Sequence, residues 1–395
     1  MQPAIKRLLS NGKHYVAKRD NVTKGSILLT EYVSAISDTD VLSAGDLTRV
    51  LMGLYGEVGG IMSTAKKHVR EREAYPGFRR ATEEEFGDTL WYLAALCKRL
   101  GISLATLFRD VTAGDDFIGA CAASDIVSGA VAHVATPATS LPLDDTLFAL
   151  GRAAAALLDA TVGNASTKTN VEIFARCYLS ALHASGLSFA NVVHMNIAKT
   201  RGAFISPNTA DLPLFDDEFG EEERIPRNFR IRVSQRSSGK SYLRWNGVFI
   251  GDPLTDNSAD RDGYRFHDVF HFAHAAILHW SPVFRALIKQ KRKSKQEYDE
   301  TEDGGRAVVI EEGLTAWIFA QAKELNFFEG QGQISFGTLK RISEFVSGYE
   351  VERCPLKLWE RAILDGYDVF RKVRDAGGGW VIGDRDARTI DFEPL

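Results

Sequence analysis

The sequence predicts a mainly α-helical protein: a tandem helical bundle that forms a pseudo-dimer within one chain, followed by a second α-helical domain with a small β-hairpin element. Apolar residues recur at three- and four-residue spacing through most of the chain, which is typical of amphipathic helices. A proline- and acid-rich stretch at 206–228 predicts a linker or a surface strap between the two parts. Asn246-Gly247, between two strand-like runs, predicts the hairpin turn.

The first half is expected to span residues 1–205 and to repeat itself, with copies at 28–112 and 144–204. KRLGISLATLFRDV resembles HASGLSFANVVHMNI: each combines a helix end, a glycine, a short turn and a new apolar helix. LMGLYGEVGGIM likewise aligns with LFALGRAAAALL, which places Arg152 opposite Glu57. One copy therefore keeps acidic residues, and the other is expected to be a scaffold.

The second half is expected to be a domain over residues 229–395. FRIRV and SYLRWNGVFIGD have the composition of strands, and four helical runs follow them. After the GGGW turn the sequence predicts a short pair of strands. The predicted helices are YRFHDVFHFAHAAILHW, AVVIEEGLTAWIFAQAKEL, LKRISEFVSGYE and LKLWERAILDGYDVFRKVRD.

Composition excludes several function classes. With 45% hydrophobic and 25% charged residues, the 395-residue chain is ordinary for a globular protein of about two to three domains. The net charge of −4 argues against bulk nucleic-acid or anionic-membrane binding. Because no secretory signal or run of about 18 apolar residues is found, a cytoplasmic location is expected. The four cysteines form no CxxC pair, so reduced thiols are expected at Cys97, Cys121, Cys177 and Cys354.

Acidic residues gather on two neighbouring helices of the first copy. Glu85 and Asp88 are three residues apart and so share a helix face, and Glu57 lies on the preceding helix. Buried together without a counter-charge, they would cost several kcal/mol per ion, on the order expected for desolvated carboxylates. Mg²⁺ would offset this with its preference for oxygen ligands. The alternative is a solvated, dipole-favoured helix start formed by the three glutamates at 83–85.

A family resemblance sharpens this interpretation. The segments EYVSAI, GLYGEVGG, KK, EEFGDTLWYLAAL and GISL, within residues 31–108, resemble the MazG-like all-α nucleoside triphosphate pyrophosphohydrolases. Their ExxE and ExxD motifs imply that Glu57, Glu85 and Asp88 bind Mg²⁺, or alternatively Mn²⁺, and are catalytic. The resemblance also implies that Lys66 or Lys67 lies near phosphate, and that a (d)NTP is cleaved to (d)NMP and pyrophosphate.

One position departs from the family pattern, because Gly60 stands where the second glutamate of ExxE belongs. The alternative function is therefore a sensor or regulator that binds a nucleotide at this site but has weakened catalysis.

A second family motif lies in the second copy. HMNIAKTRG resembles the NxxK of related dimeric folds and implies that Asn196, Lys199 and Arg201 bind the nucleotide. Its alternative is a helix end at which cations are favoured by the dipole. This half is expected to bind a nucleoside triphosphate or a related nucleotide and not to bind a membrane. Formation of a homodimer of whole chains is left open.

Histidines gather in the second half. His267, His271 and His274 share one helix face, and Asp268 lies beside them. Together with two acids of the next helix they predict a second metal or acid–base site. Metal ligands are expected at His267, His271 and Glu312; catalytic residues are expected at Asp268, His271, Glu311 and Glu312. The alternatives are hydrogen-bonded core histidines and a pair of glutamates that caps a helix.

Residues 244–392 resemble the C-terminal domain that is fused to MazG-like modules in bacterial proteins. The resemblance assigns no chemistry to this domain. A hydrolase of another phosphorylated metabolite, acting at the histidine cluster, is therefore a further alternative for the function of the chain.

Overall fold

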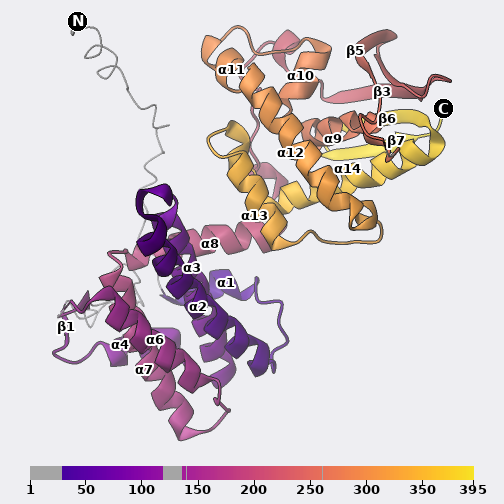
Figure 1. Cartoon of the computed structure of the whole chain (residues 1–395). Helices are drawn as coiled ribbons and strands as arrows, with labels where there is room; N and C mark the ends of the chain where they lie inside the picture. The colour runs from indigo at the N-terminus through magenta and orange to yellow at the C-terminus, as the bar shows by residue number, and fades with distance from the viewer. Residues whose placement is uncertain (1–28, 119–135, 139, 260) are drawn as a thin grey trace, which may run out of the picture. The chain divides into compact units, whose positions relative to one another are not determined.

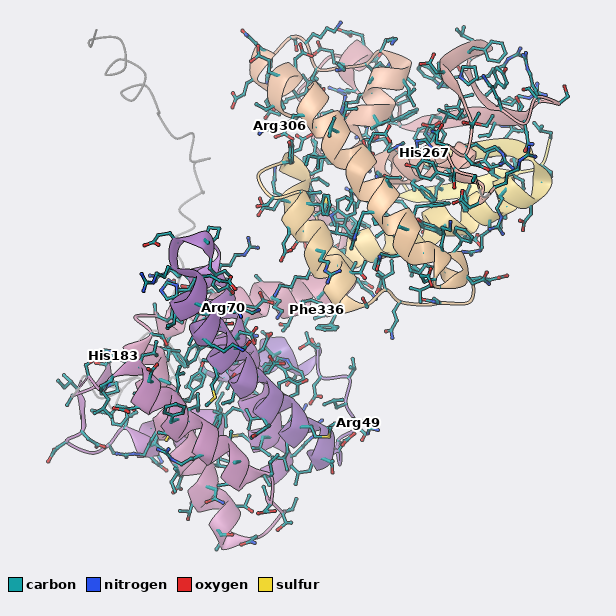
Figure 2. All side chains as sticks on the ribbon, in the orientation of Figure 1. Arg49, Arg70, His183, His267, Arg306 and Phe336 are labelled. Carbon is teal, nitrogen blue, oxygen red and sulfur yellow. The ribbon has the colours of Figure 1, made fainter. Side chains whose placement is uncertain are left out.

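The computed structural model describes residues 29–118, 136–138, 140–259 and 261–395. The expectations for the first 28 residues and for Cys121 lie outside these ranges. The chain divides into two compact units, Met1–Ile205 and Ser206–Leu395 (Figure 1). Side chains fill the space between the elements of each unit, and each unit has its own hydrophobic core (Figure 2).

The first unit is a helical bundle. Its two short strands, β1 and β2, pair antiparallel. The elements are α1 Leu29–Ser37, α2 Leu47–Glu71, α3 Phe78–Leu100, α4 Leu104–Val111, β1 Phe117–Ile118, β2 Thr136–Pro137, α6 Leu143–Leu157, α7 Ala165–Ala184 and α8 Phe189–Phe204, with a 3₁₀ turn at Arg72–Ala74. Core residues such as Phe86, Leu90 and Leu93 repeat at three- and four-residue spacing along α3, which explains why this stretch forms an amphipathic helix.

Two helix junctions of the first unit have the same construction. After α3, Gly101 adopts a left-handed conformation (φ 69°) and Ser103 accepts a hydrogen bond from the first turn of α4. After α7, Gly186 (φ 66°) and Ser188 do the same for α8. Helix α8 packs on α3, and α4 packs on α7.

The second unit contains a larger sheet than the sequence predicts. Its five strands have the order β5-β4-β3-β6-β7, and all neighbours are antiparallel. The predicted hairpin turn is present, since Asn246 and Gly247 both have positive φ. The strands are β3 Asn228–Gln235, β4 Ser241–Trp245, β5 Val248–Leu254, β6 Gly378–Asp384 and β7 Thr389–Glu393. The hairpin and the predicted C-terminal pair merge because β3 pairs with β6.

Helices cover one face of this sheet, with α9 and α14 packed against β6 and β7. The helices are α9 Asp268–Ala273, α10 Pro282–Ile288, α11 Gln296–Thr301, α12 Gly305–Lys323, α13 Phe336–Phe345 and α14 Leu356–Ala376. Short 3₁₀ turns lie at Thr209–Asp211, Glu221–Glu223, Tyr264–Phe266, Asn326–Phe328 and Glu350–Arg353. The single helix predicted over 264–280 is divided into a 3₁₀ turn, α9 and a π-helical turn, His274–Leu278. Together these elements confirm a mainly α fold with a β element.

The segment 206–228 is packed into the second unit, although its composition predicts a linker. Leu212, Phe215 and Ile225 belong to the core of this unit. Asp216 is fully buried and forms ion pairs with Arg285 and Arg385. Composition alone did not reveal these partners, because both arginines are distant in sequence.

Within the described residues, no single helix has the length and apolar character needed to cross a membrane. Helices α3 and α4 together pass that test, but as a pair bent by 107°. Cys97, Cys177 and Cys354 are free thiols, and Cys97 and Cys354 are buried.

Candidate functional site

Four carboxylates from two adjacent helices form what we call the carboxylate cluster: Glu57 on α2, and Glu84, Glu85 and Asp88 on α3. Helices α2 and α3 pack closely along their lengths. Burial, followed by the charges of Asp88 and Glu85, raises the pKa of Glu57 to about 7. The cluster therefore holds more negative charge than its surroundings stabilise.

Gly60 makes room for one member of this cluster. A Cβ atom added at position 60 would overlap the carboxylate of Glu85, with its distance to Cδ only 2.8 Å. The Glu85 side chain thus lies against the α2 backbone, in the space that a larger residue at position 60 would need. Gly60, the residue that departs from the ExxE pattern, thus leaves the space that the Glu85 carboxylate fills.

Helix α8 supplies the polar partners of the cluster. Lys199 forms ion pairs with Glu84 (2.8 Å) and with Asp88. Burial alone would lower the pKa of Lys199, but the charges of Asp88 and Glu84 raise it. The amide nitrogen of Asn196 donates to Asp88 Oδ1 at 3.3 Å. Asn196 and Lys199, which the sequence predicts to bind the nucleotide, therefore contact carboxylates.

The orientation of Asn196 is fixed from the opposite side. The buried hydroxyl of Tyr32, on α1, donates to Asn196 Oδ1 at 3.0 Å. Gly87 permits this approach of α8 to α3, since a Cβ at position 87 would lie 3.1 Å from Asn196 Cβ. Sequence reasoning did not assign a role to Tyr32, although EYVSAI was part of the resemblance.

Three residues expected at this site lie at exposed positions. Lys66 and Lys67 are exposed on α2, and Lys66 follows Glu57 by about 13 Å along the helix axis, at 1.5 Å per residue. Arg201 is exposed on α8. All three side chains therefore lie at the surface of the first unit.

The donors of the carboxylate cluster fit a hard divalent cation. Its ligand atoms are carboxylate oxygens, which Mg²⁺ prefers over nitrogen and sulfur. Lys199 forms ion pairs with two of the four carboxylates, and the raised pKa of Glu57 indicates that the negative charges still repel one another, a repulsion that a metal ion would offset. The residues that would hold it are Glu57, Glu85 and Asp88.

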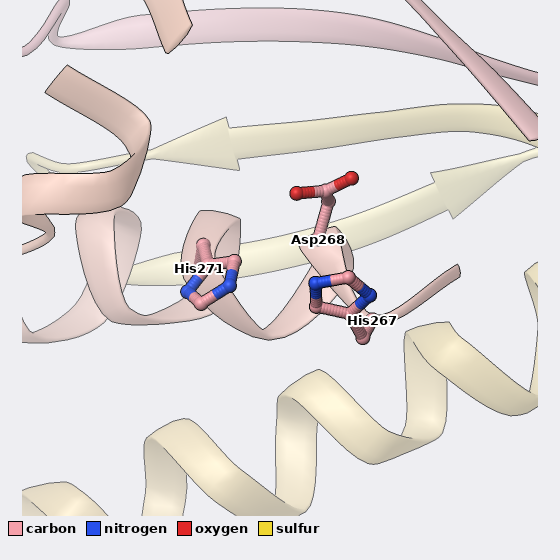
Figure 3. Close-up of side chains that lie close together, drawn as sticks. All are labelled: His267, Asp268 and His271. Atoms are coloured by element: carbon pink, nitrogen blue, oxygen red, sulfur yellow. The ribbon is translucent and has the colours of Figure 1, made fainter. Parts of the chain in front are cut away.

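A second group, which we call the histidine cluster, consists of His267, Asp268, His271 and Glu312 in the second unit. Figure 3 shows His267, Asp268 and His271 close together at the start of α9; one ligand atom of each lies within 4.8 Å of the others. Glu312, on α12, places Oε2 at 3.6 Å from His267 Nε2 and 3.5 Å from His271 Nε2. Burial raises the pKa of Asp268.

Glu311 lies behind this cluster and is fully buried. It accepts hydrogen bonds from His271 Nδ1 and His274 Nδ1, both at 3.0 Å, from the Ser281 hydroxyl, and from the Val283 amide. Burial alone would lower the pKa of His271, but the charges of Glu311 and Glu312 raise it to about 10. Burial lowers the pKa of His274. The structure thus brings the expected residues together and gives Glu311 an orienting position.

Comparison with known proteins agrees with the predicted family. Residues 210–395 match the family described as MazG C-terminal domain. The chain is 36% identical, over 85 residues, to the gene 37 protein of Mycobacterium phage L5; this covers 19% of the chain and 75% of that protein. No solved structure matches. The chain therefore belongs to a MazG-associated family.

Proposed function

We propose that the first unit is a nucleotide pyrophosphohydrolase that uses Mg²⁺, or alternatively Mn²⁺, to convert a (d)NTP to (d)NMP and pyrophosphate. The carboxylate cluster carries this proposal, because Glu57, Glu85 and Asp88 converge from two helices and their mutual repulsion, with burial, raises the pKa of Glu57. Membership of a MazG-associated family supports it. The metal, when bound, would supply charge stabilisation at the phosphates and orient a water molecule.

The residues of the chain divide the remaining tasks. Glu57 would hold the metal together with Glu85 and Asp88, and because its pKa is about 7 without a metal, it would release a proton when the metal binds near neutral pH. Lys199 positions Asp88 and Glu84 and carries a flexible ammonium that can also contact a phosphate oxygen. Asn196, held by Tyr32, keeps Asp88 in a single orientation.

A nucleotide-binding sensor is the second candidate, and it rests on a specific observation. Lys199 already neutralises part of the cluster, and Gly60 contributes no ligand. A chain of this kind would bind a nucleotide without cleaving it. It would then raise its melting temperature with an NTP and release no pyrophosphate.

The test is a panel of NTPs and dNTPs with Mg²⁺ or Mn²⁺, with NMP and pyrophosphate measured for the wild type and Asp88→Asn. Loss of a metal ligand at the reacting centre is expected to reduce turnover at least about a hundredfold. Asp110→Asn, at an exposed position of α4, is the matched control and is expected to keep full activity. Equal turnover in wild type and Asp88→Asn would contradict the proposal.

A further inference from the structure

We propose that the histidine cluster of the second unit is a binding site for one divalent first-row transition metal ion, with Nε2 of His267, Nε2 of His271 and the carboxylates of Asp268 and Glu312 as ligands. This site is separate from the carboxylate cluster and does not depend on the pyrophosphohydrolase proposal. Glu311 is assigned a positioning role instead of a ligand role.

The hydrogen bonds fix the tautomer of both rings. His267 Nδ1 lies 2.9 Å from the carbonyl oxygen of Tyr264, which can only accept, so Nδ1 carries the proton and donates. His271 Nδ1 lies 3.0 Å from the Glu311 carboxylate and donates for the same reason. In the neutral form of each ring, the lone pair is therefore on Nε2. Such outer hydrogen bonds orient histidine ligands in metal sites.

The free lone pairs converge on the same point. Both Nε2 atoms face Glu312 Oε2, at 3.6 and 3.5 Å. His271 is fully buried, and its Nε2 has no hydrogen-bond partner in the part of the chain that the structure describes. A histidine Nε2 that faces a carboxylate carries a proton when no metal is bound, and a metal ion that binds there displaces that proton and takes its place between the same atoms.

The spacing of these atoms suits a metal ion. Two ligand atoms that are each about 2.1 Å from a metal are about 3.0 Å apart at a right angle and about 3.4 Å apart at a tetrahedral angle. The observed separations lie just above this range, before any contraction on binding. A carboxylate oxygen of Asp268 completes a set of ligand atoms drawn from one helix and its neighbour.

The donor set selects the class of metal. Two imidazoles with carboxylates favour Zn²⁺, Fe²⁺, Mn²⁺ or Co²⁺, whereas Mg²⁺ is bound mainly by oxygen. Glu312 is 40% exposed at its side chain, while the histidine side chains are at most 9% exposed. The site is thus buried on the histidine side and reachable by water or a substrate on the Glu312 side.

Glu311 is excluded as a ligand because its oxygens are already used by four donors. An alternative site formed by His271, His274 and Glu311 would need Nδ1 protons to be lost and these bonds broken. His274 therefore serves as an internal control: it belongs to the alternative site but not to the proposed one.

The test uses the full-length chain and Co²⁺, whose visible absorption reports nitrogen and oxygen ligands. The wild type is expected to bind one equivalent at this site, and Asp88→Asn is expected to keep that absorption. His267→Gln and Glu312→Gln are expected to weaken Co²⁺ binding at least about tenfold and to change the spectrum. His274→Gln and His183→Gln, the latter in the first unit, are expected to bind as the wild type does.

Two outcomes would overturn the assignment: unchanged Co²⁺ absorption in both His267→Gln and Glu312→Gln, or its loss in His274→Gln but not in His267→Gln. Circular dichroism of each variant separates a lost ligand from a lost fold. Glu312→Gln keeps the test decisive even if a buried histidine variant fails to fold, because Glu312 is partly exposed.

Discussion

At the residue scale, Gly60 and Glu85 behave as one unit. The carboxylate of Glu85 takes the space beside the α2 backbone that a side chain at position 60 would occupy. The space of the missing glutamate is therefore filled by a neighbouring carboxylate from α3. The neighbouring Gly59 provides a contrast, since a Cβ there would meet nothing within 4 Å.

We therefore expect Gly60→Ala to push the Glu85 carboxylate away from Glu57 and to weaken Mg²⁺ activation of pyrophosphate release by about tenfold, the loss typical of a misplaced metal-site group. Gly59→Ala is the matched control and is expected to keep activity and to raise stability by roughly 0.5–1 kcal/mol, as a helical glycine-to-alanine change does. Activity would be compared across a Mg²⁺ titration. Equal Mg²⁺ dependence in both variants would show that the position of Glu85 does not matter.

His279 links stability to pH in the second unit. Burial, together with Arg385 and Arg388, lowers its pKa from 6.5 to about 3. Between these values the unfolded chain binds a proton that the folded chain does not, so stability falls as pH falls from about 6.5 towards 3. The slope from this group is at most about 1.4 kcal/mol per pH unit.

His279→Asn is expected to remove this slope, because asparagine tolerates the left-handed backbone (φ 62°) and carries no titrating group. Urea unfolding at pH 6.5, 5.5 and 4.5, followed by tryptophan fluorescence, measures it. Five of the six tryptophans lie in the second unit and report on it. A variant whose stability falls with acid as steeply as that of the wild type would assign the slope to other groups.

Glu311 provides a third test at this scale. Glu311→Gln keeps the shape of the side chain but removes the charge that holds His271 Nδ1. Loss of such an orienting carboxylate is expected to weaken Co²⁺ binding by about ten- to a hundredfold and to shift the Co²⁺ absorption. Glu300→Gln, at an exposed position of α11, should change neither. If Glu311→Gln weakens the fold but leaves the Co²⁺ spectrum and the Co²⁺ affinity unchanged, Glu311 has only a structural role.

At the element scale, two helix junctions of the first unit have the same construction, and the sequence similarity that predicts a repeat lies in these junctions. We expect Ser103→Ala and Ser188→Ala each to lower the free energy of unfolding of this unit by about 1 kcal/mol, the usual cost of a lost helix cap. Chemical denaturation followed by circular dichroism would test this. Clearly unequal losses would mean that the two junctions are not equivalent.

The sequence predicted elements whose information is local. Helices α2, α3, α7, α12 and α14 follow from apolar periodicity, and the Asn246-Gly247 turn follows from its backbone requirement. Pairing of β3 with β6 depends on residues separated by the whole helical part of the second unit, so no local pattern shows it. The π-helical turn after α9 is likewise set by packing: Ala275, Ala276 and Ile277 are fully buried.

The candidate sites were likewise predictable only where the information is local. Spacing on one helix predicted that Glu85 and Asp88, or His267 and His271, share a face. Contacts between helices were not predictable: Lys199 pairs with carboxylates, and Tyr32 fixes Asn196. The exposed positions of Lys66 and Lys67 also depend on how α2 is rotated against its neighbours, which a family motif does not specify.

At the scale of the whole molecule, two units with separate cores carry the two proposed sites, which differ in donor chemistry. One is all oxygen, and the other mixes imidazole with carboxylate. We therefore expect the sites to be independent: Asp88→Asn should leave Co²⁺ affinity within about twofold of wild type, and His267→Gln should leave pyrophosphate release within the same limit. Changes larger than this in either direction would reveal coupling between the units.

The pairing of β6 with β3, the central strand of the sheet, has a consequence for how the protein is made. Strand β3 emerges from the ribosome long before β6, its hydrogen-bonding neighbour, is synthesised. Until then one edge of β3 is an open template for pairing with other nascent chains. A premature stop codon after α14 would make that exposure permanent, so such truncated products should accumulate as aggregates instead of as shortened, folded proteins.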